Sequence, residues 1–104
     1  MPDPLIRIKR LVLAQRVIFT MKAEDEMFAD NLTPELVFEA IMNAPVITKT
    51  LRSRNSQSGQ RETLYVIKGL TYDALTVYTK GKLAAFEGRE VFYVLISSKQ
   101  STDD

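Results

Sequence analysis

The spacing of the apolar residues changes at Pro45, and this change constrains the fold more than any other feature of the chain. Before Pro45, apolar residues recur every three or four positions, which is typical of helices that bury one face. After it, segments rich in β-branched and aromatic residues alternate between apolar and polar positions, which is typical of strands. Because helices and strands are segregated along the chain, the sequence predicts an α+β fold. Its 104 residues suit a single domain, with residues 100–104 as a disordered tail.

Three helices are expected before Pro45. The first begins at Pro4, because proline suits the first helical turn. The second begins after Thr20 and the third after Thr33, since threonine is a good N-cap residue. The third helix stops before Pro45, which cannot continue it. The segment 16–19 is too short to be assigned.

Four strands are expected after Pro45, in an antiparallel sheet that the three helices cover on one face. The short connection at 69–73 predicts a hairpin, while segments 52–60 and 82–90 are expected to be mobile loops. The expected strands are 46–51, 63–69, 74–80 and 91–98.

Strand alternation divides the expected sheet into an inner face under the helices and an outer face toward solvent. The apolar residues that should form the core are Leu5, Ile8, Leu11, Val12, Phe28, Leu36, Val37, Ile41, Leu64, Val66, Val77, Val94 and Ile96. The residues expected on the outer face are Arg61, Thr63, Tyr65, Thr76, Tyr78, Lys80, Tyr93, Ser97 and Lys99. The outer face should therefore be polar, basic and aromatic.

Basic residues concentrate in segment 44–82, which has seven of them against two acidic residues, whereas segment 24–43 has six acidic residues and no basic one. Tyrosines are interleaved with the basic residues, and this composition suits phosphate neutralisation combined with base stacking. The segment thus predicts an RNA-binding surface, although an ordinary solvated strand face would have the same composition. The basic residues of the segment are Lys49, Arg52, Arg54, Arg61, Lys68, Lys80 and Lys82.

The chain has no cysteine and no histidine, which excludes disulfides, thiolate metal sites and cysteine nucleophiles and removes the usual general base. No metal or cofactor is expected, since consecutive carboxylates at 24–26 diverge by about 100° per residue around a helix. Lysine, arginine and tyrosine can still promote a cleavage reaction in which the 2′-hydroxyl of the RNA is the nucleophile. This reaction needs a proton acceptor, cations that stabilise the charge on the phosphate, and a proton donor. The longest apolar run, 91–96, is far shorter than the roughly 20 residues of a membrane helix, so a cytoplasmic protein that binds no membrane is expected.

Short motifs along most of the chain carry a resemblance to known proteins. They are Ile8-Lys9-Arg10-Leu11-Val12, Val17-Ile18-Phe19-Thr20, Leu32-Thr33-Pro34-Glu35, Arg61-Glu62-Thr63-Leu64-Tyr65-Val66-Ile67, Leu75-Thr76-Val77-Tyr78 and Val91-Phe92-Tyr93-Val94-Leu95-Ile96. Together they resemble a small uncharacterised bacterial domain family that is grouped by fold with the RelE- and barnase-like toxins and the MqsR-type mRNA interferases. The resemblance implies a RelE-like sheet and a metal-independent endoribonuclease of a toxin–antitoxin module. It also implies two partners, an mRNA, free or on the ribosome, and an antitoxin protein.

The resemblance extends to individual site residues. By position and type, Arg61, Tyr78 and Lys80 correspond to the catalytic residues on the sheet of these toxins. The other residues expected to bind RNA are Lys22, Lys49, Arg52, Arg54, Tyr65, Lys82 and Lys99.

Position 22 departs from the family pattern. Relatives usually carry a histidine two residues after the threonine that corresponds to Thr20, whereas this chain has Lys22. A lysine can contact a phosphate but exchanges protons poorly near neutral pH. An alternative function is therefore a non-catalytic protein–protein interaction module that has lost the catalytic histidine and docks a partner through the sheet or through helix 33–43.

Overall fold

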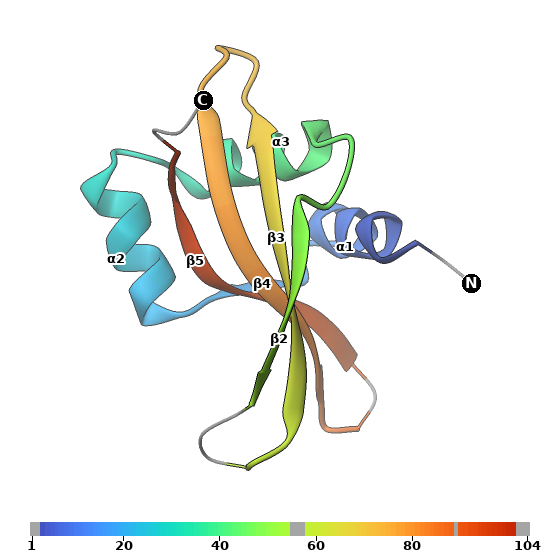
Figure 1. Ribbon diagram of the computed structural model, residues 1–104. Helices are drawn as coiled ribbons and strands as arrows, with labels where there is room; N and C mark the ends of the chain where they lie inside the picture. Colours follow the sequence, from blue (N-terminus) through green and yellow to red (C-terminus); the bar gives the residue numbers. More distant parts are fainter. Residues whose placement is uncertain (1–2, 55–57, 89, 102–104) are drawn as a thin grey trace.

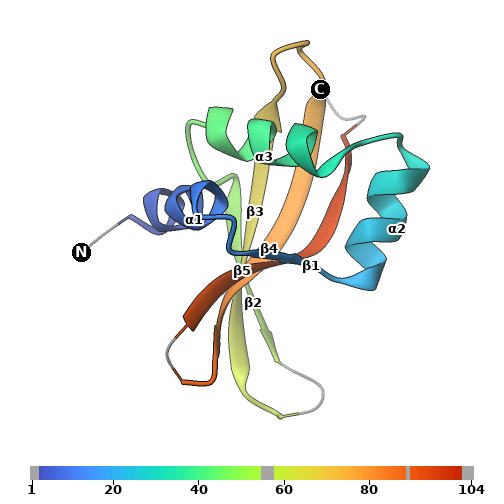
Figure 2. The same cartoon turned by 180° about the vertical axis from the view of Figure 1, so that it is seen from behind.

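The computed structural model describes residues 3–54, 58–88 and 90–101, which form three helices packed against one twisted sheet (Figure 1). In the view turned by 180°, the helices lie between the viewer and the sheet, and α1 and α3 cross its strands (Figure 2). The elements are α1 (Pro4–Leu13), β1 (Val17–Phe19), α2 (Met21–Ala29), α3 (Pro34–Asn43), β2 (Lys49–Arg54), β3 (Arg61–Leu70), β4 (Thr76–Phe86) and β5 (Glu90–Gln100). The predicted α+β class is confirmed.

Local capping explains where the three helices begin. The Asp3 side chain accepts a hydrogen bond from the backbone N–H of Leu5 at 2.9 Å, directly before Pro4 opens α1. Thr20 and Thr33 each cap the next helix, because their hydroxyl oxygens accept from backbone N–H groups three residues later at 3.2 Å. The predicted helix starts at Pro4, after Thr20 and after Thr33 are confirmed, and α3 ends at Asn43, before Pro45.

The sheet has five strands in the order β1-β5-β4-β3-β2, so the expected four-stranded antiparallel sheet is wrong. The additional strand is β1, which pairs in parallel with β5 from Val17 opposite Tyr93 to Phe19 opposite Leu95. All other neighbouring strands are antiparallel. Three residues have no measurable periodicity, and the pairing partner of β1 lies more than 70 residues away along the chain. Local pattern therefore does not reveal this strand.

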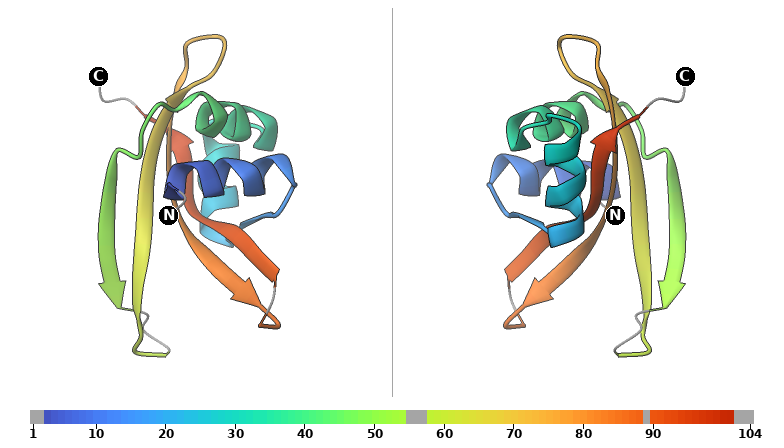
Figure 3. Two further views of the ribbon diagram at one scale, coloured as in Figure 1. Left: turned by 90° about the vertical axis from the view of Figure 1, so that its right-hand side faces the viewer. Right: turned by 90° about the vertical axis from the view of Figure 1, so that its left-hand side faces the viewer.

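The strands are longer than expected, and the sheet divides at one end. Residues 52–54 belong to β2 and residues 82–86 to β4, although both segments were expected in mobile loops. Pairing between β3 and β4 stops at Tyr65 opposite Gly81, while both strands continue beyond these residues. The β2–β3 and β4–β5 hairpins consequently extend past the helices as two diverging ribbons (Figure 3). The hairpin expected at 69–73 joins β3 to β4.

Some predictions concern residues at the limits of the structure. Residues 55–57 and 89 of the expected mobile loops, and residues 102–104 of the expected tail, lie outside the described residues. Gln100 was expected in that tail but is the last residue of β5. The backbone N–H of Ser101 then donates to the carbonyl oxygen of Thr76 at 2.9 Å.

The faces of β3, and of β5 over residues 91–95, are reversed relative to the prediction. Ile67 and Leu95 are fully buried in the core under the helices, and Tyr65 packs beside them. Their neighbours Val66 and Val94 are also buried but point to the opposite face, because residues opposite each other in the register share a face. Strand β4 keeps the expected orientation, with Val77 inside. In β5, Lys99 lies opposite Tyr78 and so shares its face, as expected.

The predicted core is correct for most of its helical members. Among all the residues predicted for the core, in helices and strands, the buried ones are Leu5, Ile8, Val12, Val37, Ile41, Val66, Val77 and Val94. Leu11, Leu36, Leu64 and Ile96 are half-buried. Phe28 is 63% exposed, so its placement in the core is wrong. Helix α2 lies along β5 and buries the narrow stripe of Ala23 and Met27, which leaves the neighbouring Phe28 in solvent.

Helix α3 lies directly on the backbone of β3 because Gly69 has no side chain. A Cβ atom at Gly69 would lie 1.8 Å from the carbonyl oxygen of Ala40 in α3. Such a distance is impossible for non-bonded atoms, so the position requires glycine. This contact holds α3 across one face of the sheet. The helices lie on that face, and the opposite face faces away from them (Figure 1).

Candidate nucleic-acid interface

Five lysines and one tyrosine share the face of the sheet that no helix covers, and we call this set the lysine face. Cross-strand pairing aligns Lys68 of β3, Tyr78 of β4 and Lys99 of β5 in one row. A second row begins with Lys49 of β2 and continues through Val66 to Lys80. The lysine face consists of Lys49, Lys68, Tyr78, Lys80, Lys82 and Lys99.

A hollow of about 540 Å³ lies on the lysine face, on the side of Lys68, Tyr78 and Lys99. Its lining is Thr48, Lys49, Val66, Lys68, Tyr78, Lys99, Gln100 and Ser101. Val66 is fully buried, and the Lys99 ammonium lies 5.4 Å from the centroid of the Tyr78 ring, within the range of a cation–π contact. The hollow therefore combines an aromatic ring with ammonium groups that can bind anionic oxygen atoms.

Most lysines of this face have no counter-ion. Lys82 is the exception, because its ammonium lies 2.5 Å from the Glu62 carboxylate. Within the described part of the chain, Lys49, Lys68, Lys80 and Lys99 form no ion pair. Like charges gathered on one surface create a positive potential that attracts polyanions.

The structure does not bring the three expected catalytic residues together. Tyr78 and Lys80 are two positions apart on β4 and share the lysine face, as expected of the outer face. Arg61 lies opposite Arg54 at the tip of the β2–β3 ribbon, where both side chains point to the other face of the sheet. The reversed alternation of β3 accounts for this difference.

The three arginines expected to contact RNA form a separate cluster. Arg52, Arg54 and Arg61 line a small hollow of about 250 Å³ with Ser53 on the β2–β3 ribbon, beyond the helices. All three are exposed. They make a second basic surface on the face opposite the lysine face.

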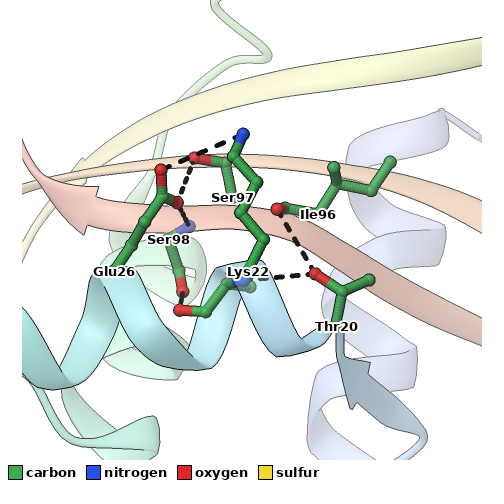
Figure 4. A network of polar contacts seen from close by, with 7 residues as sticks. Thr20, Lys22, Glu26, Ile96, Ser97 and Ser98 are labelled. Atoms are coloured by element: carbon green, nitrogen blue, oxygen red, sulfur yellow. Dashed lines mark hydrogen bonds and ion pairs between the residues drawn. The ribbon is translucent and has the colours of Figure 1, made fainter.

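Several other residues that were expected on the outer face are buried or half-buried in the structure. Tyr65 and Thr63 lie on the helix side of β3 and are half-buried, and Tyr93 is fully buried, so their expected outer-face positions are wrong. Ser97 is also buried, next to a bulge between β4 and β5. Its hydroxyl donates to the Glu26 carboxylate at 2.6 Å (Figure 4).

The Glu26 contacts explain the position of Lys22. Glu26 also accepts from the backbone N–H of Ser98 at 3.2 Å, which anchors α2 to β5. Lys22 lies one turn earlier on α2, with its ammonium 4.0 Å from the same carboxylate (Figure 4). Lys22 thus lies on the helix layer, on a different element from the lysine face.

Tyr93 is the one buried side chain in the described residues whose polar atom lacks a hydrogen-bond partner. Its ring lies against Gly81, where a Cβ atom would come within 2.5 Å of the ring. Burial raises the pKa of the Tyr93 hydroxyl above its ordinary value of 10.0, and the charge that Tyr65 acquires on ionisation raises the pKa further. Tyr93 is therefore neutral over the physiological range and cannot serve as a base.

Lys68 is a residue of this surface that strand alternation does not predict. The expected orientation of β3 would turn it toward the helices, together with Leu64 and Val66. A signal was available in the spacing of Lys68 and Gly69, since the glycine marks the side on which α3 approaches. Lys68 must then point away from the helices.

Comparisons with protein family models, with curated proteins and with solved structures gave no match. The relation to RelE-like toxins therefore stays a hypothesis based on short motifs. In the segments that the structure describes, no helix has the length and apolar content needed to cross a membrane. The same segments contain no group of three or more carboxylates placed to hold a metal ion.

Proposed function

We propose that this protein is a cytoplasmic RNA-binding domain that holds single-stranded RNA on the lysine face. The observation that carries this proposal is the gathering around Tyr78, on the four adjacent strands β2 to β5, of four lysines that form no ion pair with any described residue. Lysine ammonium groups neutralise phosphates, and a tyrosine ring stacks with any base. Single-stranded RNA offers both groups, because its bases are not paired.

The row Lys68, Tyr78 and Lys99 supports a particular arrangement of the strand. Neighbouring strands are about 4.8 Å apart, so this row spans about 10 Å. Lys68 and Lys99 lie on the two strands on either side of Tyr78. A base stacked on Tyr78 would place the phosphates on its two sides next to Lys68 and Lys99. Lys80, two positions along β4, would contact the next phosphate.

RNA cleavage by a toxin of a toxin–antitoxin module is a second proposal, supported by the common face of Tyr78 and Lys80. In this proposal the 2′-hydroxyl oxygen attacks the adjacent phosphorus and the bond from phosphorus to the 5′-oxygen breaks. Lys80 stabilises the charge that develops on the phosphate, Tyr78 donates its proton to the leaving 5′-oxygen, and water takes the proton of the 2′-hydroxyl. Arg61 takes no part in it, since it lies on the opposite face. Incubation with RNA should then give fragments that end in a 2′,3′-cyclic phosphate, and Tyr78→Phe should abolish them. Intact RNA after incubation with wild type leaves binding as the function.

Fluorescence anisotropy with a labelled single-stranded RNA, measured at several salt concentrations, tests the binding proposal. Lys80→Gln and Lys99→Gln should each weaken binding and reduce the slope of log affinity against log salt by about 0.7, the value for one phosphate contact. Tyr78→Leu should weaken binding by about 1–3 kcal/mol at an unchanged slope, because it removes stacking and not charge.

A matched control distinguishes the lysine face from general electrostatic attraction. Arg7 is exposed on α1, in the helix layer, and Arg7→Gln removes the same charge as Lys80→Gln. The slope should stay at the wild-type value in Arg7→Gln. If Lys80→Gln and Lys99→Gln bind RNA like wild type, or if Arg7→Gln reduces the slope equally, the lysine face is not the binding site.

A further inference from the structure

A groove of about 560 Å³ lies in the helix layer, on the side of the molecule away from the lysine face. It runs between the C-terminal end of α1 and the length of α3, and the turn between β3 and β4 closes one end with Tyr72. Figures 2 and 3 show α1 and α3 side by side on the same face of the sheet. The lining residues are Val12, Leu13, Gln15, Glu35, Phe38, Glu39, Met42 and Tyr72.

Large apolar side chains around this groove are left in contact with water. Leu13 is 70% exposed and Tyr72 is 83% exposed, and both line the groove together with the half-buried Phe38 and Met42. A single exposed leucine is common in monomeric proteins, but several large apolar residues around one concave surface indicate an interaction site.

The charged residues of the groove all have the same sign. Glu35 and Glu39 are four positions apart on α3 and therefore lie on one side of the helix, next to Phe38 and Met42. Glu39 accepts a hydrogen bond from the backbone N–H of Tyr72 at 2.5 Å, which fixes its carboxylate at the end of the groove. Among the described residues, no lysine or arginine lines the groove.

We propose that this groove binds an amphipathic helix of a partner protein, whose apolar ridge contacts Leu13, Phe38 and Met42 and whose lysines or arginines pair with Glu35 and Glu39. Helices bind grooves in this way through apolar residues at intervals of three and four positions. The acidic side chains exclude an acidic helix, because like charges would then be desolvated next to each other. The groove is thus a second interaction surface, opposite in charge to the lysine face.

Two fluorescein-labelled model peptides test this proposal by anisotropy. One is an amphipathic helix made of leucine and lysine, and the other has glutamate in place of every lysine. Both peptides are titrated into the full chain carrying Lys80→Gln and Lys99→Gln, so that the lysine face attracts the acidic peptide less strongly. The leucine–lysine peptide should bind saturably, and the leucine–glutamate peptide should bind at least tenfold more weakly. The proposal is overturned if the leucine–lysine peptide does not saturate or if the two peptides bind equally.

Variants with matched controls then locate the binding site. Leu13→Ser and Glu35→Lys should each raise the Kd of the leucine–lysine peptide at least tenfold. Met21→Ser and Glu24→Lys are the controls, because Met21 is 79% exposed on α2 and Glu24, like Glu35, lies in the first turn of a helix and is exposed. The controls should stay within twofold of wild type. Equal weakening by the α2 variants would show nonspecific adsorption and would overturn the proposal.

Discussion

Replacing Tyr93 by phenylalanine should stabilise the protein, although Tyr93 is fully buried in the core. Its hydroxyl oxygen has no hydrogen-bond partner in the described residues, so folding removes the group from water without compensation. An unsatisfied buried polar group costs about 1–3 kcal/mol. Removing one oxygen atom leaves a void of about 12 Å³, which costs about 0.3 kcal/mol. The net expectation is a gain of about 1–2 kcal/mol.

Urea denaturation measures this gain directly. With a slope of about 1–3 kcal/mol/M for a small domain, a gain of about 1–2 kcal/mol should raise the unfolding midpoint of Tyr93→Phe by about 0.3–2 M at neutral pH. Tyr72→Phe is the control, since Tyr72 is 83% exposed and its hydroxyl is hydrated in both states. A midpoint for Tyr93→Phe below that of wild type would show that the hydroxyl has a favourable partner in the folded protein, and the reasoning would fail.

The pH dependence of stability gives an independent test at the same residue. Burial raises the pKa of Tyr93 in the folded protein above the ordinary value of 10.0, so the unfolded chain releases this proton first as the pH rises. Tyr93 therefore contributes a loss of stability that begins near pH 10 and approaches about 1.4 kcal/mol per pH unit. The loss should be absent in Tyr93→Phe. Parallel stability curves for the two proteins between pH 9 and 11.5 would contradict the raised pKa.

Two further substitutions test the packing that positions the lysine face, and both are measured by chemical and thermal denaturation. Gly69→Ala should lower the free energy of unfolding by about 3 kcal/mol or more and the Tm by at least about 12 °C. The reason is that the new Cβ atom would contact the backbone of α3, which cannot rotate away as a side chain can. A loss below about 1 kcal/mol would contradict this close approach. Glu26→Ala should cost about 2 kcal/mol, since it removes the acceptor of Ser97 and Ser98, while Glu26→Gln should cost less because it keeps an acceptor oxygen. Equal losses in the two Glu26 variants would refute the role of these hydrogen bonds.

The helices could be predicted from sequence because the signals that start and stop them are local. Thr33 followed by Pro34 defines the start of α3 through one hydrogen bond within four residues. The parallel strand β1 could not be predicted in the same way. Its stability comes from pairing with β5, and nothing within Val17–Phe19 identifies that partner.

The orientation of β3 shows why half of the candidate site was misplaced. Residues 64–67 are all apolar, so alternation does not distinguish the two faces. The choice is made by Gly69, where α3 touches the backbone. The glycine is visible in the sequence, but beside the expected turn at 69–73 it does not by itself show that a helix packs on it. In β4, by contrast, Tyr78 and Lys80 alternate with Val77, and the expected face is correct. Arg61 was misplaced because its position was inferred from the ambiguous segment of β3.

The position of β5 between β1 and β4 has a consequence for biosynthesis. Until residues 90–100 have left the ribosome, β1 has no strand to pair with and α2 has no surface to cover. Helices of nine or ten residues are marginal on their own in water. The apolar side chains of Ile8 and Met27 would therefore stay accessible on the nascent chain until that segment emerges. Formation of the complete sheet must therefore follow the synthesis of β5.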